Sequence, residues 1–335
     1  MSDLRSNACR MARSARARGL SLIELLVALT IAAVLIAGAT TVYVDSRKTY
    51  EVNETTARLQ ETARYALSVL EPDIRMSNYW GLVKGAGIVI NQAAPAAAPA
   101  GAPTACGNNY AHNLIRNIEG SNDSYSLGCA AFNAKAVLSA DTLTIRRAAI
   151  TPSGAPATGR LRICSTRVLA ELVTDSSGCT AAPAGQTNDL IVNAYYVDQD
   201  STQRNGLPSL RRKALIAGPD FTDEEVIPGV EDMQVQFGVD PNGTTGVAQR
   251  YINPAALGAN QQIVSVRIWL LIRAENTEVG FRDGRTYEYA NRAAATGTTN
   301  NLTTAAAAGF AYVPADGFRR MLVSRTIQIR NALGT

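Results

Sequence analysis

Twenty consecutive residues, from Leu25 to Val44, carry no charge. As an α-helix this run would extend about 30 Å, the thickness of the hydrocarbon core of a bilayer. Its border is abrupt, because five arginines precede Gly19 and a single acid, Glu24, stands at the head of the run. An acid deep in a membrane costs about 2.5–3.5 kcal/mol on insertion scales. Any account of this chain must therefore explain Glu24.

The net charge of +4 lies wholly in residues 1–19, which hold five arginines and one aspartate. The rest of the 335-residue chain is balanced, so no basic face for nucleic acid is expected. Hydrophobic residues make up 46% of the chain and charged residues 18%, which is compatible with a substantial core in one large or two ordinary domains.

Three general explanations of residues 1–44 each leave something out. A secretory signal peptide would end after a short apolar core, whereas here the chain stays apolar beyond the A-x-A-like Ala37-Gly38-Ala39. A plain signal anchor explains the arginines through the positive-inside rule but not Glu24. A buried helix of a soluble core is rarely apolar on all sides over this length.

The stretch Gly19-Leu20-Ser21-Leu22-Ile23-Glu24-Leu25-Leu26 resembles the prepilin leader motif of type IV pilins and type II secretion pseudopilins. The resemblance implies that 1–19 is a leader peptide, that a membrane peptidase cleaves between Gly19 and Leu20, and that Leu20 is then N-methylated. Residues 20–44 would form the transmembrane and filament-core helix. Leu20 and Ser21 depart from the commoner phenylalanine and threonine.

The resemblance also gives Glu24 a role as the fifth residue of the mature chain. Cleavage would create an α-amino group at Leu20, and a carboxylate on the same or a neighbouring subunit can pair with it. In a low-dielectric setting such a pair favours one axial stagger between subunits, since an unpaired acid is costly there. The alternative is an interfacial acid that faces lipid headgroups.

Residues 45–76 are expected to continue the helix in amphipathic form, with Pro72 ending or kinking it. The apolar positions recur at helical spacing: Leu59, Ala63, Ala66, Leu67, Leu70 and Ile74. Residues 77–335 then read as a periplasmic β-rich domain, in which Tyr79-Trp80-Gly81 is an aromatic plug before a turn.

Extended segments separated by turns, without alternating helices, predict an α+β fold: a long N-terminal helix packed on a C-terminal antiparallel β-sheet domain. The predicted strands are 141–147, 160–165, 190–197, 207–216, 233–239, 263–272 and 321–330, the last with Arg325 interrupting its apolar face. Low-complexity loops are expected at 93–105 and 293–309.

Several blocks resemble PilW-type minor pilins: 65–81, Gly206–Arg212, Val230–Asp240, Val264–Arg273 and the ending 318–331. The resemblance fails over 93–183. It implies a minor pilin that helps initiate, or forms the tip of, a type IV pilus serving twitching or adhesion. The implied partners are other minor pilins, the major pilin, the inner-membrane assembly platform and the prepilin peptidase. The chain would be a single-pass inner-membrane protein with a cytoplasmic N-terminus, and would lie on the pilus after assembly.

Four cysteines follow the apolar run, which suggests two disulfides in an oxidising compartment. Of the three possible pairings we prefer the sequence-local one, Cys106–Cys129 and Cys164–Cys179, because each bond would close one loop. Buried or reactive thiols are the alternative. The spacing lacks the C-x2–4-C pattern of zinc sites.

The sequence offers no catalytic set and predicts neither a metal nor a cofactor. His112 is the sole histidine, and no P-loop motif occurs. Asp198-x-Asp200 with nearby Asn205 could suggest a calcium loop, but the EF-hand offsets are missing and solvated turn acids are preferred. The remaining alternatives to a pilus subunit are a type II secretion pseudopilin and, less favoured, a tip adhesin or an anchored enzyme.

Overall fold

A computed structural model describes residues 19–91, 105–107, 109–153, 159–174, 179, 185–218, 220–258 and 261–332. The chain divides into two units, Met1–Glu54 and Thr55–Thr335, and one continuous helix begins in the first and ends in the second. The predicted leader, apart from Gly19, and the predicted loop 93–105, apart from Ala105, lie outside the described residues.

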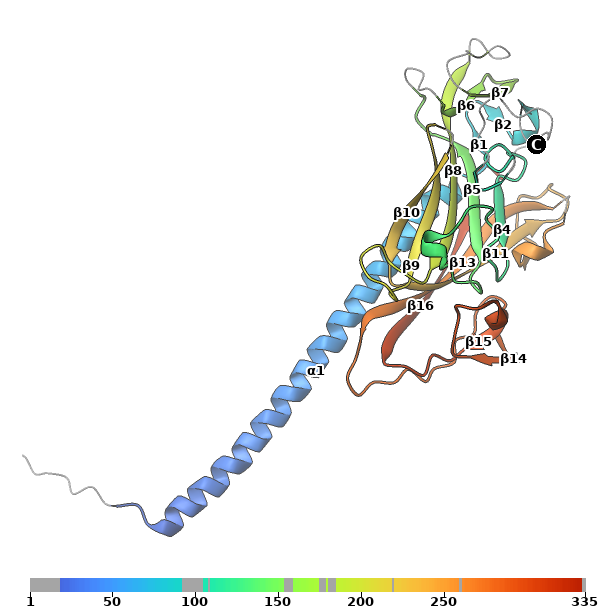
Figure 1. Cartoon of the computed structure of the whole chain (residues 1–335). Helices are drawn as coiled ribbons and strands as arrows, with labels where there is room; N and C mark the ends of the chain where they lie inside the picture. Colours follow the sequence, from blue (N-terminus) through green and yellow to red (C-terminus); the bar gives the residue numbers. More distant parts are fainter. Residues whose placement is uncertain are drawn as a thin grey trace, which may run out of the picture. The chain divides into compact units, whose positions relative to one another are not determined.

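The elements follow one another as labelled in Figure 1. They are helix α1, Leu22–Arg75; β1, Tyr79–Trp80; β2, Val83–Lys84; the 3-10 turn η1, Ala86–Ile88; β3, Val89–Ile90; β4, Ile118–Ser121; η2, Phe132–Ala134; β5, Thr142–Ala148; β6, Leu161–Ser165; β7, Ala170–Thr174; β8, Gln186–Asp198; β9, Ser209–Ile216; β10, Asp220–Pro228; β11, Val230–Asp240; β12, Arg250–Ile252; η3, Pro254–Ala256; β13, Gln262–Thr277; β14, Ala293–Thr299; η4, Ala305–Ala307; β15, Phe310–Tyr312; and β16, Phe318–Gln328.

The strands of the second unit form two main sheets. The larger has eight strands in the order β10-β9-β8-β6-β7-β3, with β5 pairing β8 and β4 pairing β5. The smaller has the order β12-β11-β13-β16 and is antiparallel throughout. The α+β prediction of a long helix on an antiparallel-rich domain is confirmed, with two sheets in place of the single one expected. The predicted strands correspond to β5, β6, β8, β9, β11, β13 and β16, and the remaining strands, among them the long β10, have no predicted counterpart.

Helix α1 spans 54 residues, or about 80 Å. It begins when the amide of Leu25 donates to the carbonyl of Ser21 at 3.1 Å. The expected break at Pro72 does not occur, because the helix continues to Arg75. Pro72 lies in the last turn, where its own carbonyl still accepts from Met76 at 3.1 Å. A proline there removes one hydrogen bond close to the end, so the helix loses little.

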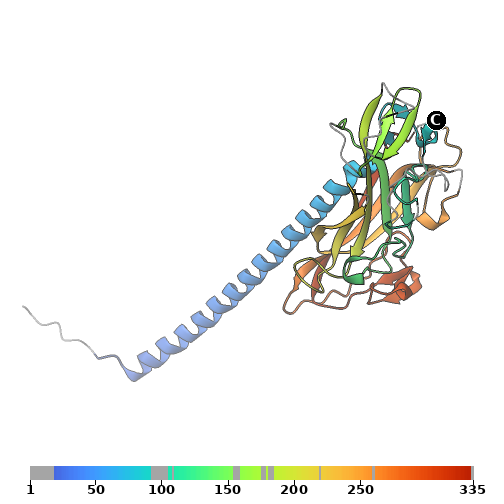
Figure 2. The same cartoon turned by 45° about the horizontal axis from the view of Figure 1, so that its top comes forward.

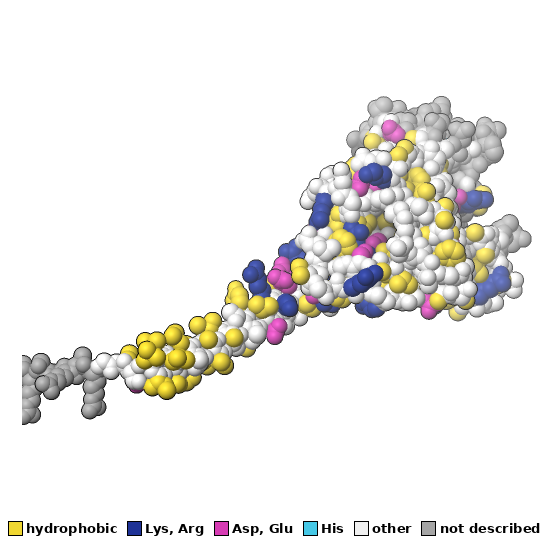
Figure 3. Space-filling model, turned by 60° about the horizontal axis from the view of Figure 1, so that its bottom comes forward, with side chains coloured by type: hydrophobic (Ala, Val, Ile, Leu, Met, Phe, Trp, Pro, Cys, Tyr) yellow, Lys and Arg dark blue, Asp and Glu magenta, His cyan; other side chains and the backbone are white. Residues whose placement is uncertain are grey.

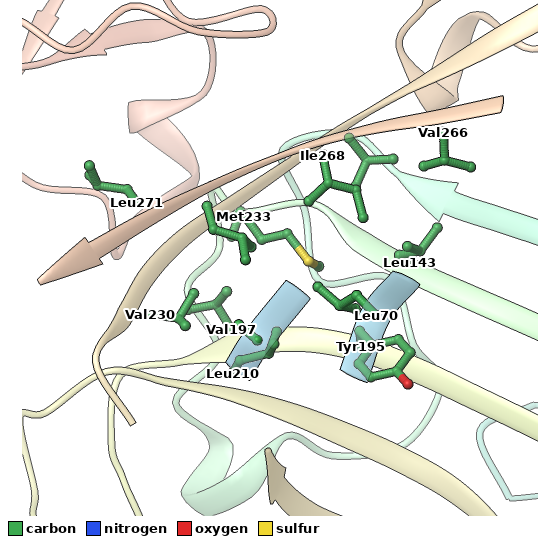
Figure 4. Packing of buried hydrophobic residues seen from close by; sticks show 14 of the residues in the cluster. Leu70, Leu143, Tyr195, Val197, Leu210, Val230, Met233, Val266, Ile268 and Leu271 are labelled. Carbon is green, nitrogen blue, oxygen red and sulfur yellow. The ribbon is translucent and has the colours of Figure 1, made fainter. Parts of the chain in front are cut away.

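The second half of α1 packs into the core of the domain. Its buried apolar side chains are spaced three or four residues apart and share one face: Leu59, Ala63, Ala66, Leu70 and Ile74. They join one cluster with side chains from both sheets. Figure 4 shows Leu70 among Leu143, Tyr195 and Met233. In two views the end of α1, in light blue, lies among strands of both sheets (Figure 1, Figure 2).

A carboxylate fixes how this helix sits on the larger sheet. Asp73 is 5% exposed, and the Arg147 guanidinium of β5 donates to its Oδ1 from Nε at 3.0 Å and from Nη2 at 2.7 Å. From β8, Asn193 and Tyr195 donate to Oδ2 at 2.5 and 2.6 Å. Burial raises the pKa of Tyr195 well above its ordinary value, so its hydroxyl keeps the proton that it donates.

Another acid ties the same helix to the smaller sheet. Glu71 accepts from Arg325 of β16 at 3.1 Å and from Arg75 at 2.7 Å. This contact explains why a charge interrupts the apolar pattern of β16. Glu71 and Asp73 therefore hold the last turns of α1 to different sheets.

Two adjacent acids at the start of β11 hold the C-terminal region in place. Asp232 pairs with Arg292 at 2.7 Å, and both side chains are fully buried. Glu231 accepts from Arg320 of β16 at 2.9 Å and lies 3.5 Å from Arg273. Glu231 lies at a register shift between Val230 and Asp232, and the two acids reach different arginines. Buried charges are tolerated when they are paired in this way.

The segment 293–309 corrects the expectation of a low-complexity loop. It contains β14 and η4, and β14 pairs in parallel with β15. Arg292, anchored at Asp232, immediately precedes the strand, and Ala293 donates to the Gly309 carbonyl at 3.1 Å. The small side chains of β14 are largely exposed, so the sequence lacks the alternation that marks a half-buried strand.

Residues 80–192 supply a second, separate core. Trp80 lies in it with no exposed surface, as the aromatic plug predicted. Gly81 follows with φ of 80°, and a Cβ there would lie 2.3 Å from the Ser165 hydroxyl, so the turn needs glycine. Two disulfides link Cys106 to Cys129 and Cys164 to Cys179, which are the sequence-local pairs.

Replacing the buried helix acid should unfold the domain more easily. Asp73→Ala leaves Arg147 unpaired at 14% side-chain exposure, and we expect a loss of about 3–5 kcal/mol in the free energy of unfolding. Denaturant unfolding of the full chain in detergent, followed by circular dichroism, measures it. The control is Glu61→Ala, an exposed acid of the same helix, expected to change stability by about 0.5 kcal/mol or less. Equal losses in both variants would contradict the anchoring role.

Candidate assembly site at the head of the apolar helix

The predicted cleavage site is open in the structure. Gly19 and Leu20 precede the helix, and both are exposed. No atom lies within 4 Å of the position that a Cβ would take on Gly19, and its backbone is not in the left-handed region. The fold of the chain therefore places no demand for glycine at this position.

Glu24 lies in the first turn of α1 and is exposed. A carboxylate at a helix N-terminus interacts favourably with the unpaired amides of that turn, by about 0.3–1 kcal/mol. Within the described residues, its side chain has neither an ion pair nor a hydrogen bond. Its charge is thus available to a group outside the described chain.

The threonine hydroxyls of the apolar run are satisfied internally. The hydroxyls of Thr30, Thr40 and Thr41 donate to helix carbonyls one turn earlier, at 2.7–2.9 Å. In hydrocarbon no water replaces a missing partner, so such internal bonds make hydroxyls tolerable. Glu24 differs from them, because its carboxylate cannot be satisfied by the carbonyls of its own helix.

The surface of the run needs a covering of lipid or protein. Among the described residues, α1 is the one helix long and apolar enough to cross a membrane, and none of the side chains in its apolar window is buried. Large apolar side chains are exposed from Leu20 to Val44. Figure 3 shows them as a yellow band at the start of the helix, followed by charged side chains. A continuous apolar band of this size marks an interaction surface.

Two family models match the chain. A prokaryotic N-terminal methylation motif covers residues 14–40, the segment that holds Gly19, Leu20 and Glu24. The model described as type IV pilus-assembly protein W (PilW) covers residues 194–331, from the end of β8 through β16. Together the two matches support a PilW-like type IV minor pilin.

Other comparisons add less. Among solved structures, this minor pilin is similar to a type IV-like pilin from Thermus thermophilus, with 13% identity, 83% of this chain and 98% of that chain covered, and a TM-score of 0.36. That likeness is too low to decide anything. No curated protein matches. The family consists of structural subunits of pilus assembly, which implies contact with other pilus components. The motif and the apolar helix fit membrane anchoring.

The PilW match contains ionic contacts that sequence reasoning did not identify. Glu231, Arg273 and Arg320 come from three separate family-like blocks, and the fold brings them together in one sheet. The available signal was an acid pair at the start of an otherwise apolar strand. These contacts are structural, because Arg320 has no exposed side-chain surface.

No described cluster of three or more His, Cys, Asp or Glu side chains could hold a metal ion. His112 is buried and its Nε2 pairs with Asn109 at 2.8 Å. The interpretation of Asp198 and Asp200 as solvated turn acids is wrong, since they are 0% and 2% exposed. Asp200 pairs with Lys135 at 2.9 Å, whereas Oδ2 of Asp198 has no partner among the described residues.

The buried Asp198 predicts a dependence of stability on pH. Burial raises its pKa from 3.8 to about 6. The unfolded chain releases this proton at lower pH than the folded chain, so the folded state loses stability as pH rises between these values. Asp198→Asn removes this loss. Relative to wild type, the variant should gain about 1 kcal/mol of stability on going from about pH 5 to about pH 7.5.

Denaturant unfolding at both pH values measures this gain, with exposed Asp220→Asn as the control. A pH-independent difference between Asp198→Asn and wild type would show that Asp198 is ionised throughout.

Proposed function

We propose that this minor pilin is cleaved between Gly19 and Leu20, methylated at the Leu20 amine and held in the inner membrane with its C-terminal domain in the periplasm. From there it enters the initiating or tip complex of a type IV pilus. The observation that carries the proposal is Glu24, a carboxylate without a partner among the described residues, on a helix whose threonines Thr30, Thr40 and Thr41 bond to its own carbonyls.

Cleavage changes the electrostatics at the head of the helix. It removes all five leader arginines and leaves a chain with equal numbers of basic and acidic residues. The new α-amino group at Leu20 lies four residues before Glu24. In a bundle of such helices, the amine of one subunit and the carboxylate of its neighbour attract strongly, because little water screens them. That attraction favours the stagger at which both charges are paired.

The assembly step then needs no chemical turnover. The apolar helix is stable in the bilayer and equally stable inside a bundle of similar helices, so it can move from one to the other as the filament grows. The proposed partners are other minor pilins, the major pilin and the inner-membrane platform. The PilW match favours a pilus over a type II secretion pseudopilus.

Processing can be tested separately from folding. Gly19→Val should abolish the smaller mature form on gels while leaving thermal unfolding unchanged, because a side chain at Gly19 meets no other atom. Gly38→Val is the matched control, since Gly38 also has open space around it and lies 19 residues beyond the cleavage site. Normal cleavage of the Gly19→Val chain would refute the assigned site.

Counting surface pili in deletion and complemented cells tests the role of Glu24. We expect cells that lack the gene to have few surface pili and poor twitching, and wild-type piliation there would refute the minor-pilin role. Complementation with Glu24→Gln should restore membrane insertion but lower pilus number about tenfold, consistent with loss of one charge pair in a low-dielectric site. The control is Glu51→Gln, an exposed acid beyond the apolar run.

Pilus length separates the finer roles. If the protein initiates filaments, the few remaining pili should have normal length, because elongation does not use it. Electron microscopy of sheared pili measures both number and length. Loss of secreted enzymes with intact pili would instead indicate the type II secretion alternative.

A further inference from the structure

The outer edge of β16 is open along most of its length. β16 is the last strand of the smaller sheet, and its register with β13 runs without a bulge from Arg320 to Gln328. Among the described residues, no backbone hydrogen bond reaches the outer edge of 321–328. Ser324, Arg325 and Thr326 are exposed in succession, so both faces of the strand are open there. An edge of this kind presents a row of unpaired amides and carbonyls.

The edge of the larger sheet is protected in a way that β16 is not. β10 carries a register shift between Glu225 and Ile227, ends at Pro228, and bears four acids that face a basic partner strand. Bulges, prolines and charges are the usual means by which proteins prevent strand addition. Residues 321–328 (MLVSRTIQ) contain no proline and one charge. This edge is therefore suited to pairing with another strand.

Positive charge gathers beside the open edge. Arg75 and Arg325 share one acid, Glu71, and their side chains are 57% and 54% exposed. Arg330 follows β16, is exposed, and its amide donates to the Arg75 carbonyl at 2.9 Å. Its side chain has no ion pair among the described residues. Two arginines share one glutamate, and Arg330, whose amide bonds to Arg75, adds a third positive charge, which leaves a local positive excess.

From these two features we propose that β16 binds an extended acidic segment of another subunit, which adds to the smaller sheet as its next strand. Backbone hydrogen bonds would supply the attraction and side chains the specificity. Residues two apart share a face, so the partner should carry an acid opposite Arg325 and an apolar residue opposite Val323 or Ile327. Polar residues would lie opposite Ser324 and Thr326.

A second copy of this chain fits the edge poorly. Residues 321–328 contain an arginine and no acid, so self-pairing brings like charges together without compensation. The proposal rests on the chain working within a multi-subunit assembly, but it does not depend on Glu24 or on cleavage at Gly19.

Site-specific crosslinking of the full chain in piliated cells tests the proposal. A photoreactive benzoylphenylalanine in place of Thr326 should give one defined product with another subunit, whereas the same group in place of Val279, which is 97% exposed, should give none. Arg325→Glu combined with Arg330→Glu should lower the yield about tenfold, and the charge-conserving Arg325→Lys should retain it. Protease resistance of each variant checks that the domain is folded.

The outcomes are distinct from those of the assembly test. No product at 326, a product that is a dimer of this chain, or a yield unaffected by charge reversal would each overturn the proposal. If pili still depend on Glu24 in that case, the proposed function stands without strand addition at β16. Conversely, charge-dependent crosslinking in cells whose pili do not need Glu24 would support the edge and reject the assigned role of Glu24.

Discussion

The buried contact between the second half of α1 and the two sheets is the interaction on which the domain depends. Burying a large apolar side chain contributes about 1.5–3 kcal/mol, and Leu59, Leu70 and Ile74 are all buried on this one helix face. Apolar contact alone is non-directional, so it does not fix how the helix is rotated. Asp73, held by Arg147 and by two strand side chains, supplies that direction.

The first half of the helix is suited to an environment without water. Its threonines satisfy their hydroxyls on their own backbone, which is the rule for a segment that no water reaches. An acid cannot be satisfied in that way, and we propose that Glu24 lowers its free energy by pairing with a cation on another subunit. The two acids thus have opposite consequences. Asp73 is fully paired inside the fold and stabilises one chain, whereas Glu24 has no partner in the described chain, and its proposed role is to favour association.

A feature could be predicted from the sequence when it is determined by residues close to it in the chain, and not when it is determined by contacts that form only on folding. Glu24 could be singled out because the motif that contains it is eight consecutive residues long. Strands β11 and β13 could be predicted because their apolar residues alternate in the first and form a nearly continuous run in the second. β10 was missed because its acids resemble a solvated loop, and their partners Arg211, Arg212 and Lys213 lie on another strand. Asp198 was judged solvated for the same reason. Burial of a turn acid depends on segments that meet it only after folding, such as the one containing Ala136.

The two parts of the domain are held together by different means. Residues 194–331, which match the PilW model, contain the buried pairs Asp232–Arg292 and Glu231–Arg320 and a sheet of long strands. Both disulfides lie before that match, in a region of mostly short strands with its own smaller core. Short strands bury little, and a disulfide closing a loop of about 15–25 residues offsets this by about 3 kcal/mol. The disulfides therefore add stability in the part of the domain whose strands are shortest.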